Sequence, residues 1–283
     1  MSQAEPLIRN ISDTARLAAV YRARETERAD GLFRDPLARR LAGDRGEQIA
    51  AVMPASNRHT WAWVTRTYLF DQYLAEELQQ GADMVVNLAA GLDARPYRMA
   101  LPATLQWVEV DLPELFSYKE PLLAGEKPAC VLERIPLDLA DAESRRSLFA
   151  RLGKRARHIV VLTEGLLVYL TRDMVGALAD DLSAAGFERW ILDLMSPRLL
   201  HLLQRTIGGP LGEARAHLQF APPEGPAFFE GHGWQVREIR SPLKTAKRLK
   251  RLPWFLRLIS WLPDSQGRRP NRPWSGICLL ARP

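Results

Sequence analysis

Apolar residues in the second part of the chain gather into short continuous runs, each ending in a turn or a polar cluster. The runs cover residues 84–88, 106–110, 129–135, 158–162, 190–194, 235–239 and 276–281. Apolar runs of about five to seven residues are typical of strands buried on both faces, as in a parallel sheet. We therefore predict a strand at each run, with the last two closing the sheet.

Helical patterns fill the spaces between these strands and the chain before them. Residues 61–79 predict a helix, DPLARRLAG predicts a helix that Gly43 ends, and residues 172–185 predict a helix that Gly186 ends. Strands alternating with helices form βαβ units with parallel strands. We predict an α/β fold with a doubly wound, mostly parallel sheet. A helical extension over residues 1–80 precedes a core over residues 81–283, in which residues 196–233 form a helical insertion or lid.

The composition is that of an ordinary globular protein. The chain has 283 residues, 47% hydrophobic and 25% charged, and no apolar stretch approaches the ~18–20 residues of a membrane span. The first residues, MSQAEPLIRN, show no secretory signal. Cys130 and Cys278 lie in predicted strands, where buried free thiols are expected. We predict a cytoplasmic protein without a metal site, because no HExxH or paired CxxC pattern is present.

The formal net charge of +6 comes largely from basic residues between positions 237 and 272. Such an excess suits an anionic partner, but a solvated helix face explains it better, and no motif for base modification accompanies it. We therefore expect no nucleic acid partner. Residues 244–262 are both basic and aromatic. Packing against the fold is favoured there, with a substrate lid or a weak contact with a membrane surface as alternatives.

Small and acidic residues follow the first two predicted strands. Ala89, Ala90 and Gly91 form a turn that lets the backbone approach a ligand closely. The turn lacks the G-x-G-x-x-G pattern, so a tight pyrophosphate site is not supported. Asp111 ends the second strand, about 20 residues further on, where a carboxylate can accept both ribose hydroxyls of a nucleoside. Capping of the following helix is the alternative role for Asp111.

Acidic residues also follow the third and fourth strands. Asp138 can accept a hydrogen bond from an adenine amino group, and Leu139 can offer its backbone N–H and an apolar face. Asp138 and Asp141 are equally good helix caps. Glu164 follows the fourth strand within an apolar stretch, so it needs a partner, since burying an unpaired charge is costly. A sulfonium ligand with an ammonium group, or a structural arginine, would satisfy it.

Together these motifs resemble one family. The runs VVNLAAGLDARPYRM, WVEVDLPELFSYK, IPLDL and LTEGLLVYL, with TRTYLFDQYL before them, are similar to the leucine carboxyl methyltransferase family. The likeness is strongest to its bacterial branch of small-molecule, polyketide-type O-methyltransferases and spans about residues 12–169. The resemblance implies a Rossmann-like class I methyltransferase core that binds S-adenosylmethionine and releases S-adenosylhomocysteine.

The same resemblance implies roles for particular residues. Arg66 would bind the carboxylate of the methionine moiety, and Glu164 its amino group. Asp111 would hold the ribose, while the remaining cofactor contacts would come from Ala89, Gly91, Asp138 and Leu139. The family's GAG-type turn is AAG in this chain, a mild departure. The chain beyond Leu170 matches poorly, and the choice of substrate would be encoded there.

The acceptor is predicted to be a small molecule with a carboxylate or a phenolic hydroxyl group. A carboxylate is already ionised at neutral pH, whereas a phenol benefits from a base. Tyr169 is predicted to face the acceptor, and His201 and His217, in the insertion, are the candidate bases. The alternatives are a non-catalytic binding protein with this fold and a nicotinamide-dependent oxidoreductase. No pattern predicts an oligomer interface.

Overall fold

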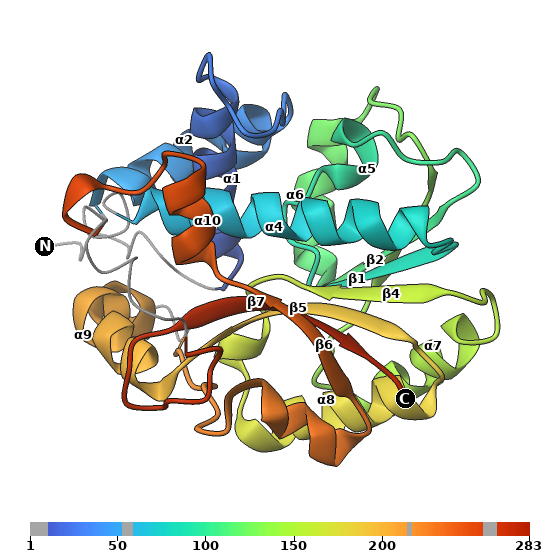
Figure 1. Ribbon diagram of the computed structural model, residues 1–283. Coiled ribbons are helices and arrows are strands. Elements are labelled where there is room, and N and C mark those ends of the chain that lie inside the picture. The colour runs from blue at the N-terminus through green and yellow to red at the C-terminus, as the bar shows by residue number, and fades with distance from the viewer. Residues whose placement is uncertain (1–10, 53–58, 214–216, 257–264) are drawn as a thin grey trace, which may run out of the picture.

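A seven-stranded sheet runs through the middle of the protein (Figure 1). The computed structural model describes residues 11–52, 59–213, 217–256 and 265–283. Within them the strand order is β3-β2-β1-β4-β5-β7-β6. The strands are β1 (Met84–Leu88), β2 (Gln106–Asp111), β3 (Val131–Pro136), β4 (Ile159–Thr163), β5 (Arg189–Met195), β6 (Gln235–Arg240) and β7 (Ser275–Ala281). Each predicted strand is therefore confirmed, with ends that differ by no more than two residues.

The pairing of the strands makes the sheet doubly wound. Neighbouring strands from β3 through β5 are parallel, and the chain order reverses between β1 and β4. β7 lies between β5 and β6 and is antiparallel to both. The prediction of a doubly wound, mostly parallel α/β sheet is confirmed. In such sheets the point where the strand order reverses opens a crevice at the carboxyl ends of the strands, where ligands bind.

Helices cover both faces of the sheet (Figure 1). On one side lie α1 (Ile11–Thr26), α2 (Ala38–Val52), α4 (Thr60–Gln79), α5 (Arg95–Arg98), α6 (Pro113–Leu123) and α10 (Pro242–Arg248). On the other lie α7 (Ala142–Leu152), α8 (Arg172–Ala184) and α9 (Pro197–Glu213). Three short 3₁₀ helices are η1 (Leu167–Tyr169), η2 (Gly225–His232) and η3 (Trp254–Leu256).

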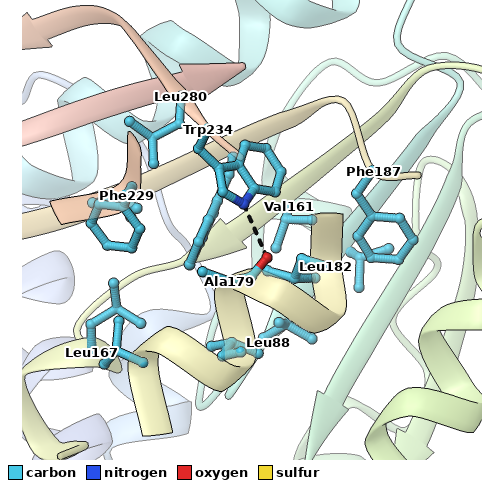
Figure 2. Packing of buried hydrophobic residues seen from close by; sticks show 14 of the residues in the cluster. Leu88, Val161, Leu167, Ala179, Leu182, Phe187, Phe229, Trp234 and Leu280 are labelled. Carbon is cyan, nitrogen blue, oxygen red and sulfur yellow. Dashed lines mark hydrogen bonds between the residues drawn. The ribbon is translucent and has the colours of Figure 1, made fainter. Parts of the chain in front are cut away.

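An aromatic cluster holds α8 and η2 against the sheet (Figure 2). Trp190 of β5 packs edge-on against Phe229 at 5.1 Å and Trp234 at 5.4 Å between ring centroids. The indole N–H of Trp234 donates to the carbonyl oxygen of Ala179 in α8 at 3.1 Å. Because every member is buried, the cluster combines apolar burial with a satisfied indole N–H.

Three local details of the fold concern a glycine, a buried carboxylate and the basic segment near the C-terminus. Gly43, with φ 60° and ψ 178°, is non-helical and separates two helical segments within Ala38–Val52, so the helix before it ends there as predicted. The buried carboxylate of Glu109 binds Lys119 at 2.9 Å. Residues 244–262 form no single helix, since α10 ends at Arg248 and only η3 follows among the described residues; residues 257–264 lie outside them.

The described part of the chain contains no helix that combines the length and apolar character needed to cross a bilayer. The described residues from Pro242 to Trp254 include both buried and exposed side chains. Pro242, Thr245 and Ala246 of α10 are buried, whereas Trp254 is 79% exposed. Packing of this segment against the fold is thus observed for α10.

Replacing Trp234 with alanine should lower the free energy of unfolding by about 3–5 kcal/mol, because it leaves a cavity and removes the indole hydrogen bond. Trp254→Ala, at an exposed position, is the matched control and should change stability by no more than about 0.5 kcal/mol. Denaturant unfolding of both variants measures the difference. Equal effects at the two positions would contradict the packing in Figure 2.

The ion pair between Glu109 and Lys119 gives a second prediction. Both side chains are fully buried, at 0% exposure, and Arg134 also contacts Glu109 at 2.9 Å. Lys119→Met leaves the carboxylate with Arg134 alone and should cost about 3 kcal/mol of stability. Lys127→Met, at an exposed position, should be nearly neutral. If the two substitutions prove equally harmless in denaturant unfolding, the buried pair contributes nothing.

Candidate functional site

A cavity of about 610 Å³ opens where the strand order reverses, at the carboxyl ends of β1, β2, β4 and β5. Eight of the ten residues predicted from the sequence line it: Arg66, Ala89, Gly91, Asp111, Asp138, Leu139, Glu164 and Tyr169. His201 and His217 do not. The fold thus brings together side chains that follow four different strands.

The turn after β1 and the end of β2 form the first wall of the cavity. Ala89 and Gly91 have φ values of 50° and 54°, so the backbone turns sharply in the left-handed region. The two oxygens of Asp111 accept the backbone N–H groups of Gly91 and Leu112, both at 2.7 Å. Burial raises the pKa of Asp111, and these two bonds partly offset the effect. Leu112 is the N-cap residue of α6 and no side chain caps that helix, so Asp111 is not its cap.

Asp138 and Leu139 lie on the wall that follows β3. Asp141, not Asp138, caps α7 by accepting the N–H groups of Glu143 and Ser144. Asp138 accepts the N–H of Ala140 at 2.9 Å and stays exposed. With the capping role taken by Asp141, the second oxygen of Asp138 can accept a further donor.

Glu164, which follows β4, is held by two arginines. Its oxygens accept from Nε of Arg66 at 3.1 Å and from a terminal nitrogen of Arg95 at 2.7 Å. Burial would raise the pKa of Glu164, but the guanidinium groups of Arg95 and Arg66 outweigh it and hold the pKa below its usual value. Of the two kinds of partner that the sequence left open, arginine is the one in the structure.

Arg95 extends this pairing into the interior. Its side chain is 3% exposed and also binds Asp71 at 2.7 Å and Asp93 at 2.6 Å. Arg98 binds Asp71 as well. Asp93 is an acidic neighbour of Arg95 in the chain, whereas sequence reasoning missed Asp71 because it belongs to α4. The one signal available was the presence of charged residues within otherwise apolar runs.

Asp193 is a further cavity residue that sequence reasoning missed, although its position inside the apolar run WILDL was a signal. It accepts the N–H of Gly165 at 2.7 Å and lies 3.6 Å from a terminal nitrogen of Arg66. Burial raises its pKa, and Arg66 offsets this only in part. Gly165 has φ 71°, and a Cβ there would lie 3.0 Å from Arg66, so a glycine suits this position.

The rest of the cavity is mainly apolar. Side chains of β5, α9, the segment after α9 and β7 line it, among them Met195, Leu199, Leu203, Leu218 and Ile277. Tyr169, in η1 rather than at the end of β4, also lines it and is hydrogen-bonded to the side chain of Thr14. Burial raises the pKa of Tyr169, so its hydroxyl stays protonated at neutral pH.

The histidine prediction is corrected by this geometry. His201 is exposed, because the face of α9 that meets the cavity carries Leu199, Leu203 and Thr206 at helical spacing. His217, which follows α9 in the chain, is exposed as well. Among the histidines that the structure describes, it is His59 that lines the cavity. Over the same residues, no group of three histidine, cysteine or acidic side chains is placed to hold a metal ion.

Comparison with solved structures agrees with the observed fold. A DUF574 family protein from Streptomyces avermitilis superposes with a TM-score of 0.58 at 14% identity, covering 95% of this chain and 97% of that one. A protein from Thermobifida fusca, described as a methyltransferase, gives a TM-score of 0.56 at 14% identity, covering 98% and 96%. At this identity the likeness concerns the fold alone.

Comparison with sequences is more specific. A Frankia alni protein named as an S-adenosyl-L-methionine-dependent methyltransferase is 36% identical over 246 residues, which are 78% of this chain and 82% of that one. A Streptomyces coelicolor protein with the same description is 33% identical, covering 79% and 82%. The leucine carboxyl methyltransferase family matches residues 15–183. The predicted resemblance is confirmed, and the chain belongs to the leucine carboxyl methyltransferase family.

Proposed function

We propose that this protein transfers a methyl group from S-adenosylmethionine to an oxygen atom of a small, largely apolar molecule of the polyketide type, at either a carboxylate or a phenolic hydroxyl group. Membership of the family makes the chain an S-adenosylmethionine-dependent methyltransferase. The transfer to oxygen is our proposal. The observation that carries it is one cavity of about 610 Å³ with a polar end and an apolar end.

 The polar end of the cavity has the hydrogen-bonding chemistry that S-adenosylmethionine requires. Each oxygen of Asp111 already accepts one backbone N–H and keeps capacity for a second donor, as two ribose hydroxyls demand. Asp138 and Leu139 are available to the adenine ring from the neighbouring wall. Ala89 and Gly91 bring the backbone close enough to line the sugar and the methionine chain.

Glu164 and Arg66 are the residues proposed for the methionine moiety. Arg66 suits the carboxylate and Glu164 the ammonium group, because each carries the opposite charge. The ion pair between them at 3.1 Å keeps both side chains at the cavity wall before a ligand arrives. Since Arg95 and Arg66 lower the pKa of Glu164, its carboxylate stays ionised throughout the physiological pH range.

The cofactor supplies an electrophilic methyl group on a sulfonium sulfur. The displacement is in line, so the protein contributes mainly alignment and the exclusion of water. Leu199, Leu203 and Thr206 of α9 line the acceptor end, which supports the proposal that residues 196–233 act as a lid over it. In the same proposal residues 1–80 form a helical extension to the core over residues 81–283, and they supply Arg66 to the site.

Binding of S-adenosylmethionine tests the proposed cofactor site. Calorimetry should give a micromolar Kd for S-adenosylmethionine and S-adenosylhomocysteine and no binding of NADH. Asp111→Asn should raise both Kd values about 10- to 100-fold, because it weakens hydrogen bonds to a charged group. Asp141→Asn makes the same chemical change at the helix cap of α7, outside the cavity, and should leave both Kd values unchanged.

Each alternative function has its own result in this experiment. Binding of NADH in place of the sulfur compounds would favour a nicotinamide-dependent oxidoreductase. Tight binding of S-adenosylmethionine without methyl transfer to any acceptor would favour a non-catalytic binding protein. A folded protein that binds neither S-adenosylmethionine nor S-adenosylhomocysteine would contradict the proposed function.

A further inference from the structure

The charged side chains at the polar end of the cavity form one continuous network. Its links are ion pairs between 2.6 and 3.8 Å long, which run from α1 through α4 and the strand ends to β5. The cations are Arg22, Arg66, Arg95 and Arg98, and the anions are Asp35, Asp71, Asp93, Glu164 and Asp193. The network therefore holds one more carboxylate than guanidinium groups.

This excess matches the charge of S-adenosylmethionine. The molecule carries an ammonium, a carboxylate and a sulfonium group at neutral pH, hence one net positive charge. With it bound, the charges of this network would balance, while Asp111 and Asp138, which also line the polar end, add negative charge and no cation. Among the described residues, every lysine or arginine that lines the cavity already pairs with a carboxylate: Arg22 with Asp35, Arg145 with Asp181, and Arg66 and Arg95 within the network.

A carboxylate acceptor would disturb this balance. It would add a further negative charge beside those of Asp193 and Glu164, with no arginine or lysine of the described cavity lining free of a carboxylate partner. Burying an uncompensated charge is costly. A neutral hydroxyl group carries no such penalty. The apolar side chains of Met195, Leu199 and Ile277 suit the skeleton that would carry it.

Asp193 lies where the polar and apolar ends of the cavity meet. It contacts Arg66 on the polar side, while its register partner on β7 is Ile277 and the next residue on its face of β5 is Met195, both in the apolar lining. Two neighbouring groups of the cavity are less suited to accept a proton. Glu164 is held by two arginines, and Tyr169 keeps its own proton.

We propose that the methyl acceptor is a neutral hydroxyl group on an apolar, aromatic skeleton, and that Asp193 accepts its proton. This rests on the proposed function above. The hydroxyl oxygen attacks the methyl carbon and forms a new C–O bond. The C–S bond breaks, its electron pair returns to sulfur to give S-adenosylhomocysteine, and the hydroxyl proton passes to the Asp193 carboxylate. The step removes one positive and one negative charge from a buried site, which a low-dielectric interior favours.

Matched acceptor pairs test the predicted charge of the acceptor. The probes are 2-naphthol with 2-naphthoate and 4-phenylphenol with biphenyl-4-carboxylate, titrated into the full chain saturated with S-adenosylhomocysteine. In each pair the hydroxyl compound should bind at least about 10-fold more tightly, as one buried ionic penalty predicts. With S-adenosylmethionine, mass spectrometry should detect the methyl ether and no methyl ester.

Two results would overturn the inference while leaving the proposed function intact. One is a carboxylate that binds as tightly as its hydroxyl partner or yields a methyl ester. The other is a protein that binds S-adenosylhomocysteine but neither binds nor methylates any hydroxyl probe. Failure to bind S-adenosylhomocysteine at all would instead contradict the proposed function.

The role of Asp193 is tested with Asp193→Asn, which keeps the shape of the side chain. On 2-naphthol, kcat should fall about 100- to 10,000-fold, as expected when a base is lost, with KM for S-adenosylmethionine nearly unchanged. On 4-nitrophenol, whose hydroxyl group is far more acidic than that of 2-naphthol and therefore depends less on a base, the loss should stay below about 10-fold. Asp173→Asn, at an exposed position on α8, is the matched control. A uniform loss on both phenols would show that Asp193 is only structural, and an unchanged kcat on 2-naphthol would exclude it as the base.

Discussion

A single buried guanidinium group joins the elements that build the site. Arg95 is 3% exposed and binds carboxylates from three places: Asp71 of α4, Asp93 after β1 and Glu164 after β4. A buried cation is tolerated only where its partners are in place, since removing one leaves an uncompensated charge. The helix before the sheet and the ends of two strands are thus fixed relative to one another by this one side chain. The positions of this helix and these strand ends in turn determine the shape of the cavity.

The sequence predicts the strands and the residues at their ends well, because parallel strands buried on both faces require continuous apolar runs. It does not predict ionic partners, since these join residues far apart in the chain: Arg66 and Glu164 are separated by 98 positions and Arg95 and Glu164 by 69. Gly43 was predicted to end a helix, and its non-helical backbone does separate two helical segments.

The histidine prediction failed for a different reason, which is the direction of side chains on α9. Leu199, Leu203 and Thr206 share one face of this helix and line the cavity. His201, two positions after Leu199, points away from that face, because side chains two apart do not lie on the same side of a helix. Assigning a segment to the roof of a site therefore does not assign each of its residues. The helical register decides which residues face the ligand.

The residues proposed for the cofactor lie within the family match, whereas those at the acceptor end lie beyond it. The family match over residues 15–183 contains Arg66, Asp111 and Glu164, the residues proposed for the cofactor. The acceptor end is built from β5, α9 and β7, and Asp193, Met195 and Ile277 all lie beyond that match. Family membership thus accounts for the methyl donor but says little about the acceptor, in keeping with the rule that a fold hosts many functions. The acceptor has to be argued from the charges and the apolar surface of this chain itself, and those favour a neutral hydroxyl group over the carboxylate after which the family is named.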